Sequence, residues 1–408
     1  MLQFFSASTN IVNSKRAITE CLENALQGEP NLNCDLLIIH SAMGHNFNEL
    51  LTEAHKLSPT ARIAGCSCGG VIGIKGVDES MKALAIMAIK GPKEEFALTC
   101  RKNKGSGDPY REIREQALEL KGMNTDITMI QLFGTPDINF LPVEKTLDGI
   151  KSVFGKNIPI SGGLAMTSMA NFKATDLKAG SYQFFDEEVI ENGTVMIGYA
   201  DPTLKFINHA NHGFDILDGT PLEVTRSDGN TIYELNGEPA WGKITKTLGI
   251  PETFTLWQML PISGFAREIP EELWKENNSK YLISVVMDKN EDGRVVIPVE
   301  CPEGNKLYLT KRDEKLMFDG VDLIVKKIVD ELQGRKPMVV FQTDCVLRGR
   351  FSLDRILKDE ITNHIQGPIC KGENIPWLGF YSSGEFLMLG GEAWFQQISS
   401  SLFVIYRE

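Results

Sequence analysis

Helix-like and strand-like apolar patterns alternate along the first half of the chain. Apolar side chains recur at helical spacing over residues 14–27, and the short apolar runs at 35–40 and 82–89 predict buried strands. After Ile158 the strand-like runs follow one another with no helix between them, which a purely parallel sheet does not allow because its strands need crossover connections. The pattern therefore predicts an α+β protein in which mixed, largely antiparallel sheets are layered with helices.

The second half shows a similar mixture and predicts a second domain packed against the first. Buried strands are expected at 204–208 and 337–343. Further helices are expected over 231–249, with a break at Pro239, over 320–332 and over 351–366. Because the first set of strands is complete near Ala200, the sequence predicts domains 1–202 and 203–408. No repeat of short period is visible.

The composition narrows the classes of function. The chain has 408 residues, with 42 Lys and Arg against 54 Asp and Glu, and its net charge of -12 disfavours nucleic-acid binding, which needs a basic face. No run approaches the ~20 apolar residues that span a bilayer, and the first residues lack the order of a signal peptide. The 8 cysteines include no C-x-x-C pair, so we expect reduced thiols in a cytoplasmic protein.

Motifs for common enzyme chemistry are missing from the sequence. The sequence contains no P-loop, no G-x-G-x-x-G between a strand and a helix, no G-x-S-x-G and no H-E-x-x-H. One alternative remains at Cys345, since the positive charges of Arg348 and Arg350 would favour a thiolate nucleophile. The other interpretation is a buried structural thiol, and no base is evident near it.

The segment from Cys345 to Arg350 carries the strongest binding signal. It follows a predicted buried strand and precedes a predicted helix, and loops in such places hold binding groups on a rigid frame. The two arginines offer planar donors for a carboxylate or a phosphate. Further along, Tyr381 and Glu385 add an aromatic ring and a carboxylate. Glu385 either pairs with Arg348 to stabilise the fold or binds a ligand beside it, and the two roles are compatible.

Two other segments have open interpretations. Gly65, Cys66 and Ser67 are predicted at a strand that runs into a Gly-rich turn, which is either a tight turn between strands or a backbone nest for an anion. His209 and His212 are the only close histidine pair and are predicted in a loop after a strand. They are either ordinary loop residues or ligands of a metal or haem iron.

Taken in order, these segments resemble the FIST family (F-box and intracellular signal transduction). Family C-terminal domains are similar to Cys345-x-x-Arg348 followed by Gly379-Phe-Tyr381-x-x-Gly384-Glu385, and N-terminal domains to Ile63-x-Gly65-Cys66-Ser67-x-Gly69-Gly70. Between them, further family features are matched by Gly162, Gly163, Val224, Thr225, Asn230, Ile232, Glu234 and Leu235. The resemblance covers about residues 30–407, and Cys68 departs from it because many relatives carry Ser or Ala there.

The resemblance implies a cytoplasmic sensory protein without catalysis, which binds an amino acid or a small carboxylate between its domains. The expected ligand site is formed by Arg348, Arg350, Cys345, Tyr381, Glu385, Gly65, Cys66 and Ser67. Since no kinase or other output domain is recognised, the signal would pass to a separate protein such as a histidine kinase. Some bacterial relatives resemble haem-based nitric oxide sensors, so a haem sensor using His209 or His212 is the first alternative, and a Cys345-dependent enzyme is the second.

Overall fold

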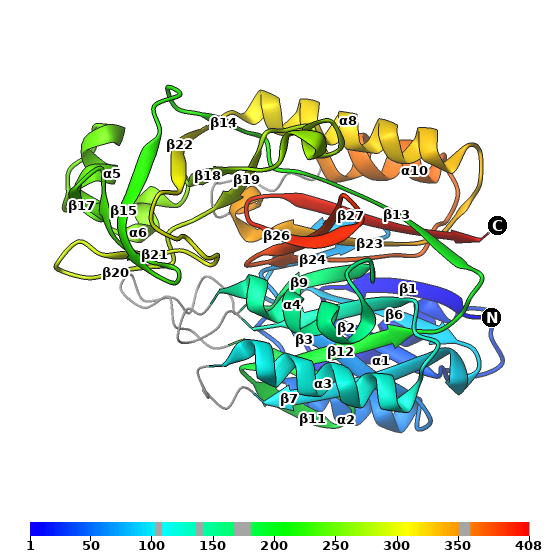
Figure 1. Ribbon diagram of the computed structural model, residues 1–408. Helices are drawn as coiled ribbons and strands as arrows, with labels where there is room; N and C mark the ends of the chain where they lie inside the picture. The colour runs from blue at the N-terminus through cyan, green and yellow to red at the C-terminus, as the bar shows by residue number, and fades with distance from the viewer. Residues whose placement is uncertain (103–107, 136–141, 167–180, 351–359, 408) are drawn as a thin grey trace.

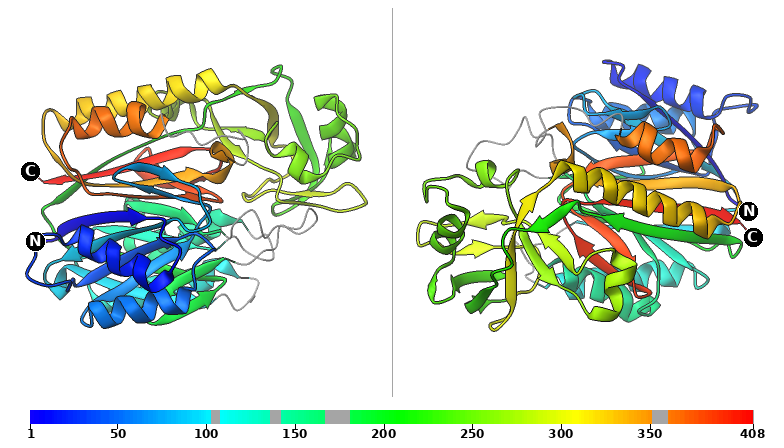
Figure 2. Two further views of the ribbon diagram at one scale, coloured as in Figure 1. Left: turned by 180° about the vertical axis from the view of Figure 1, so that it is seen from behind. Right: turned by 90° about the horizontal axis from the view of Figure 1, so that it is seen from above.

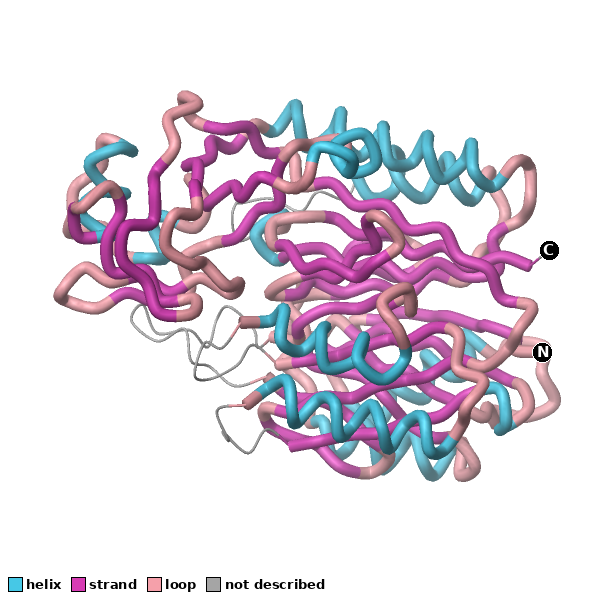
Figure 3. Tube along the Cα trace, viewed as in Figure 1, coloured by secondary structure: helices cyan, strands magenta, loops and turns pink. Residues whose placement is uncertain are grey.

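The computed structural model describes residues 1–102, 108–135, 142–166, 181–350 and 360–407. Three six-stranded sheets enclose a common core, and a fourth sheet projects at the end of the molecule opposite both termini (Figures 1 and 2). Helices lie outside the three sheets, as Figure 3 shows for the long helix over the C-terminal strands. The predicted α+β class with mixed, largely antiparallel sheets is confirmed. None of the helices in the described ranges is long and apolar enough to cross a membrane.

The strands of each sheet lie side by side in a fixed order. The first sheet contains β1 (Gln3–Thr9), β6 (Leu84–Lys90), β2 (Leu36–Ser41), β3 (Arg62–Ser67), β10 (Tyr182–Phe185) and β11 (Glu188–Glu191). The second contains β7 (Phe96–Lys102), β12 (Gly193–Tyr199), β8 (Met129–Gly134), β9 (Ile160–Leu164), β25 (Glu385–Leu389) and β26 (Glu392–Gln396). The third contains β13 (Leu204–Asn211), β27 (Ser400–Arg407), β23 (Pro337–Cys345), β24 (Trp377–Ser382), β4 (Val71–Gly73) and β5 (Gly76–Asp78).

The fourth sheet lies within the chain between β13 and the helix that precedes β23. It contains β19 (Tyr281–Ser284), β18 (Phe265–Glu268), β22 (Lys306–Arg312), β15 (Leu222–Asp228), β16 (Thr231–Leu235), β21 (Val295–Val296) and β20 (Asp288–Lys289), with β14 (Phe214–Ile216) on β22 and β17 (Glu238–Pro239) on β16. The described helices are α1 (Ser14–Ala25), α2 (Phe47–Leu57), α3 (Pro109–Met123), α4 (Val143–Phe154), α5 (Ala240–Leu248), α6 (Leu256–Met259), α7 (Trp274–Asn277), α8 (Glu314–Leu332) and α10 (Gly367–Cys370). Short helical turns are η1 (Lys93–Glu95), η3 (Glu271–Leu273), η4 (Val346–Arg348) and η5 (Glu360–Gln366).

Local sequence explains where the helices begin. The Asn13 side chain caps α1 by accepting the N–H of Arg16, and the buried face of α1 follows the predicted apolar spacing. The predicted helix over 231–249 is wrong in its first part, because residues 231–235 form β16 and a helix starts only after Pro239. Thr231, Ile232 and Tyr233 favour a strand, and Asn236 and Gly237 both take the positive φ of a tight hairpin turn. Residues 351–359 of the helix predicted at 351–366 lie outside the described ranges.

Three units of the same topology follow one another along the chain. The four central strands lie in the orders β1-β6-β2-β3, β7-β12-β8-β9 and β13-β27-β23-β24, with the last two of each set parallel. Each unit also sends a hairpin into the sheet of another unit: β4–β5 joins the third sheet, β10–β11 the first and β25–β26 the second. The units are therefore interlocked. The proposed boundary between residues 202 and 203 falls between the second and third units, and we retain it as a proposal.

One glycine position shows that the three units share a register. Gly65, Gly162 and Gly379 lie opposite Ile39, Leu132 and Gln342 of the neighbouring parallel strand. A Cβ atom at Gly65 would lie 1.9 Å from the carbonyl oxygen of Ile39, and at the other two glycines it would lie 2.3 and 2.7 Å from the corresponding oxygens. A side chain is therefore excluded at the same place in every unit.

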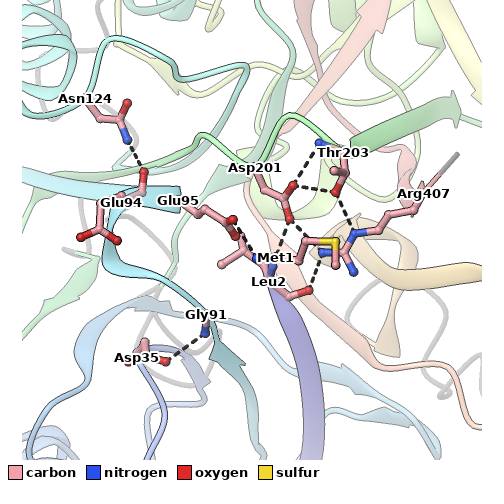
Figure 4. Close-up of polar contacts among 10 residues, drawn as sticks. All are labelled: Met1, Leu2, Asp35, Gly91, Glu94, Glu95, Asn124, Asp201, Thr203 and Arg407. Carbon is pink, nitrogen blue, oxygen red and sulfur yellow. Dashed lines mark hydrogen bonds and ion pairs between the residues drawn. The ribbon is translucent and has the colours of Figure 1, made fainter.

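The three units meet along a buried central core, and contacts between the two chain termini close the ring that they form. His40 of the first unit packs against Phe133 of the second at 5.0 Å and Phe380 of the third at 4.4 Å between ring centroids. At the far end, Arg407 donates to the Leu2 carbonyl oxygen and to Asp201 (Figure 4). The two ends of the chain are thus joined by hydrogen bonds beside the connection between the second and third units.

Candidate functional site

The candidate site lies where β23 and β24 end. These strands are parallel, so Cys345 and Ser382 meet at the same edge of the third sheet. In open sheets of this kind, ligands bind beyond the carboxyl ends of parallel strands. The chain continues from β23 into η4, which ends with Arg348. The segment singled out by the sequence is therefore at the expected edge.

Arg348 is the central charge of the site and is 1% exposed. Its Nη2 donates to Glu360 of η5 at 2.6 Å, and its Nη1 donates to the carbonyl oxygen of His212 at 3.3 Å. Burial disfavours the charged guanidinium, but Glu360 and Asp344 together raise the pKa of Arg348, so it stays charged. Of the two roles considered for Glu385, the pairing with Arg348 is not formed, because Glu360 holds that place.

A second arginine, Arg312 at the end of β22, lies beside Arg348. Its Nη2 donates to the carbonyl oxygen of Leu347 at 2.9 Å. Burial, and then the nearby charge of Arg348, lower the pKa of Arg312 to about 10. The Nε atoms of both arginines are buried without a hydrogen-bond partner among the described residues. Two buried donors are therefore unused, and a buried donor that lacks an acceptor costs free energy.

Glu79 supplies an acceptor from the first unit. It follows β5, the strand that the first unit sends into the third sheet, and its Oε2 accepts the backbone N–H of Arg350 at 2.7 Å. Its Oε1 is buried and has no partner in the described part of the chain. Burial raises the pKa of Glu79 to about 7. Arg350 takes part through its backbone, and its side chain is exposed.

Tyr381 and Cys345 lie inside the same region. Tyr381 is buried on β24, and burial followed by the charges of Glu79, Asp344 and Glu360 raises the pKa of its phenol. Cys345 is also buried, and burial raises the pKa of its thiol well above its usual range, despite the nearby Arg348. The expectation that the arginines would favour a thiolate is therefore wrong. We call Glu79, Arg312, Arg348, Glu360 and Tyr381 the Arg348 cluster.

The Gly-rich segment of the first unit lies next to this cluster, and the N–H groups of Cys68 and Gly69 donate to carbonyl oxygens of Ser41 and Tyr381. Gly65, Cys66 and Ser67 belong to β3, so the expected turn begins only after them. The Cys66 thiol contacts His40 Nδ1 at 3.4 Å, and Ser67 Oγ accepts the N–H of Tyr182 at 2.9 Å. The turn itself meets the cluster, because the N–H of Gly69 donates to the carbonyl oxygen of Tyr381 and the N–H of Tyr381 donates to that of Gly70, both at 3.0 Å. The structure thus brings the two predicted segments together.

Glu385 is buried near the cluster but is held by serines. Its Oε1 lies 2.6 Å from Ser382 Oγ, and its Oε2 accepts a hydrogen bond from Ser399 Oγ at 2.8 Å. Burial raises the pKa of Glu385 to about 8. Its side chain therefore makes internal contacts rather than pairing with an arginine.

The two histidines have protein partners. His209 lies in β13 rather than in the predicted loop, and its Nε2 is 2.6 Å from Glu331 Oε1. His212 is buried, and its Nδ1 accepts the N–H of Phe214 at 3.0 Å. Burial, and then Arg348, lower the pKa of His212 to about 4. Within the described ranges, no group of three His, Cys, Asp or Glu residues is placed to hold a metal ion.

Sequence reasoning missed three members of the cluster. Arg312, Glu360 and Glu79 come from the fourth sheet, η5 and an exchanged hairpin, so no local motif links them to Arg348. A groove of about 690 Å³ lies elsewhere, at the seam between the first and third units, and is lined by Phe4, Phe5, Arg335 and Met338 among others. It is at the opposite end of β23 from Cys345.

Comparisons with known proteins match the chain along most of its length. The FIST N domain model matches residues 35–238, and the FIST C domain model matches residues 246–388. An uncharacterized protein of Methanocaldococcus jannaschii is 25% identical over 253 residues, which are 58% of this chain and 43% of that protein. The chain thus spans less than half the length of that relative. A solved cyanuric acid hydrolase from A. caulinodans gives a TM-score of 0.27 at 6% identity, over 52% of this chain and 72% of that one.

Proposed function

Because the chain belongs to the FIST family, whose domains serve sensory signal transduction, we propose that it is a cytoplasmic sensory protein that binds a small polar ligand at the Arg348 cluster. The ligand class we propose is an amino acid, with small carboxylates as weaker ligands. The ligand would lie between the first and third units, since Glu79 comes from one and Arg348 and Tyr381 from the other.

The observation that carries this proposal is the set of unused polar atoms. The Nε atoms of Arg312 and Arg348 are donors without acceptors, and Oε1 of Glu79 is an acceptor without a donor, among the described residues. An amino acid has a carboxylate for the two donors and an ammonium group for the acceptor, and charge-assisted hydrogen bonds of this kind are the strong ones. Tyr381 lies close enough to both Glu79 and Arg348 for their charges to shift the pKa of its phenol.

The proposed output is a change in binding to a separate signalling protein, such as a histidine kinase. A ligand can shift a protein between states only by its differential affinity for them. The Arg348 cluster joins three parts of the fold, because Arg312 belongs to the fourth sheet and Glu79 to the first unit. A ligand that bridges these groups would therefore favour one arrangement of the three parts.

The test is a thermal-unfolding screen of the wild-type protein with the common amino acids and small mono- and dicarboxylates. We expect at least one amino acid to raise the midpoint, and Tyr381→Phe to reduce its affinity about tenfold, the effect of losing ~1.4 kcal/mol. Tyr199→Phe is the matched control, since Tyr199 is also buried but bonds Gln131 in the second unit. Full ligand response in Tyr381→Phe would contradict the proposed site.

Glu79→Gln tests the chemistry of the ligand. Glutamine keeps an acceptor but loses the negative charge, so we expect weaker binding of amino acids and unchanged binding of carboxylates that lack an amine. The measurement is calorimetric titration with an amino acid and its deaminated analogue. An equal loss of affinity for both compounds would show that Glu79 does not bind the amine of the ligand.

A further inference from the structure

Glu385 lies between the end of β24 in the third sheet and the turn that contacts the fourth sheet. It is the first residue of β25 and is fully buried. Besides its contacts with Ser382 and Ser399 Oγ, its Oε2 accepts the backbone N–H of Ser399 at 3.1 Å. Ser399 lies in the turn between β26 and β27, so one carboxyl group holds this turn against the end of β24.

Ser382 Oγ lies within hydrogen-bond distance of two oxygen atoms and has one proton to donate. Ser382 Oγ is 2.6 Å from Glu385 Oε1 and 3.2 Å from the carbonyl oxygen of Asp344. A hydroxyl has a single proton, so it cannot donate to both oxygens. A protonated Glu385 resolves this, because it donates to Ser382 Oγ, which then donates to Asp344.

The second unit has a neutral side chain in the equivalent place. Gln183 lies opposite Cys66, and Glu385 lies opposite Gly163. Cys66 and Gly163 each directly follow the shared glycine of their own unit. The Oε1 atom of Gln183 accepts the N–H of Gly193 at 2.6 Å, and its Nε2 donates to the carbonyl oxygen of Gly134 at 3.3 Å.

The surroundings of the two side chains correspond as well, with the Asp344 carbonyl oxygen reached through Ser382 in the third unit. Tyr199 of the second unit and Ile405 of the third occupy equivalent strand positions, opposite Met129 and Val339. Gly193 and Ser399 each lie six residues before these positions, so they are equivalent as well. Gly134 and Asp344 each lie two residues after the partner of the shared glycine. In the second unit this place is filled by a side chain that both accepts and donates. An ionised carboxylate can only accept.

The turn that Glu385 holds is strained and reaches the fourth sheet. Ile398 is buried with φ of 58°, a conformation that is costly for a β-branched residue. The equivalent residue of the second unit is Asn192, which tolerates its φ of 54° more easily. Gln397 accepts the N–H of Val285 at 2.9 Å, and its own N–H donates to Ile283 of β19 at 2.9 Å. Its Nε2 also donates to Ser383 at 2.8 Å.

We propose that Glu385 is a proton-dependent latch: in its neutral form it holds the strained turn 397–399 and so fixes β19 of the fourth sheet, and loss of its proton releases both. The titratable groups that face it in the described structure are Asp344 and Cys345 of β23. The neighbouring cation Arg348 is paired with Glu360. An ionised Glu385 would therefore add a negative charge beside Asp344 and lose its donor contact. Burial raises its pKa to about 8, which sets the latch to open at mildly alkaline pH.

The latch does not depend on which ligand the Arg348 cluster binds, and it is tested on the unliganded full chain. Amide hydrogen exchange is followed in segments 281–287 and 397–399 from about pH 6 to about pH 9, after correction for the intrinsic pH effect. We expect protection in the wild type to fall about tenfold for each pH unit between about pH 6 and the pKa of Glu385, and to level off above that pKa. Glu385→Gln should keep its protection, because glutamine fills this place in the second unit.

Glu291→Gln is the control, since Glu291 is an exposed carboxylate of the fourth-sheet region, and it should behave as the wild type does. Loss of protection at the same pH in Glu385→Gln would overturn the latch. A second measurement covers failure of that variant to fold: carbon NMR of the glutamate carboxyl groups in the wild type. An assigned Glu385 signal that titrates near pH 8 supports the proposal, and a Glu385 signal that titrates below about pH 6 overturns it.

Discussion

At the residue scale, burial changes the pKa values of the side chains that form the site. The sequence placed the segment from Cys345 to Arg350 after a buried strand, and the structure brings Tyr381 to the same sheet edge. It could not show that Arg348 pairs with Glu360, because η5 is brought to it by the fold. Nor could it show that Cys345 is buried, which reverses the expected effect on its thiol.

Removing Arg348 should destabilise the protein more than removing the whole ion pair. Arg348→Met leaves Glu360 as a buried charge without its partner, and breaking a buried pair in this way costs ~3–5 kcal/mol. The double variant Arg348→Met with Glu360→Gln leaves no unpaired charge and should lose less. Urea unfolding of the two variants measures the difference. A double variant that is less stable than the single one would contradict this account of the pair.

The pH dependence of stability should report Glu385. Its pKa is raised from 4.5 to about 8, so the folded state binds the proton more tightly than the unfolded state. This contribution is complete below about pH 4.5 and is lost as the pH rises towards 8, at ~1.4 kcal/mol per pH unit. Glu385→Gln should remove this slope in urea unfolding measured across that range. An unchanged slope would show that other groups cause it.

At the element scale, the strand and helix positions followed mostly from apolar periodicity, while the pairing of strands did not. The prediction of helix 231–249 was wrong in its first part, because alternating Thr, Ile and Tyr residues and a turn of Asn236 and Gly237 make a hairpin. The exchange of β4–β5, β10–β11 and β25–β26 left no trace in local patterns. Pairing between distant strands depends on the whole fold, and this limits what a local pattern can predict.

The shared glycine offers a test of how closely the parallel strands approach. Gly65→Ala would place Cβ 1.9 Å from the carbonyl oxygen of Ile39, so β2 and β3 would have to separate. The control is Gly28→Ala, because Gly28 also has a positive φ but no atom within 4 Å of a Cβ. We expect the control to cost ~1 kcal/mol and Gly65→Ala clearly more in urea unfolding. Equal costs would mean that backbone conformation alone requires a glycine at Gly65.

At the scale of the whole molecule, the chain is a closed ring of three interlocked units with one large insertion. The class of fold was predictable from the sequence, but the threefold plan was not, because the units agree in register at single positions such as Gly65, Gly162 and Gly379. The three units share their strand order and a few glycine positions, and this is too little similarity to give a visible period in the sequence.

The ring predicts that the chain can be opened elsewhere. Leu2 and Arg407 are linked by a hydrogen bond of 2.7 Å, and the connection between the first and second units runs through Gly91 and Pro92. A circular permutant with a short linker between the present termini and new ends at this connection should fold. Its circular dichroism and cooperative urea unfolding should match those of the wild type. A permutant opened within β23 should not fold, and equal behaviour of the two would contradict the ring.

The most direct test of the account is to locate the bound ligand. Methyl NMR of the full chain, with Val346 and Leu347 as reporters beside Arg348, is recorded during titration with the amino acid that most stabilises the protein. We predict saturable shifts of these two methyl signals at the concentration that raises the thermal midpoint. Shifts confined to Met338 and Ile375 in the seam groove, with Val346 and Leu347 unchanged, would show that the ligand binds elsewhere.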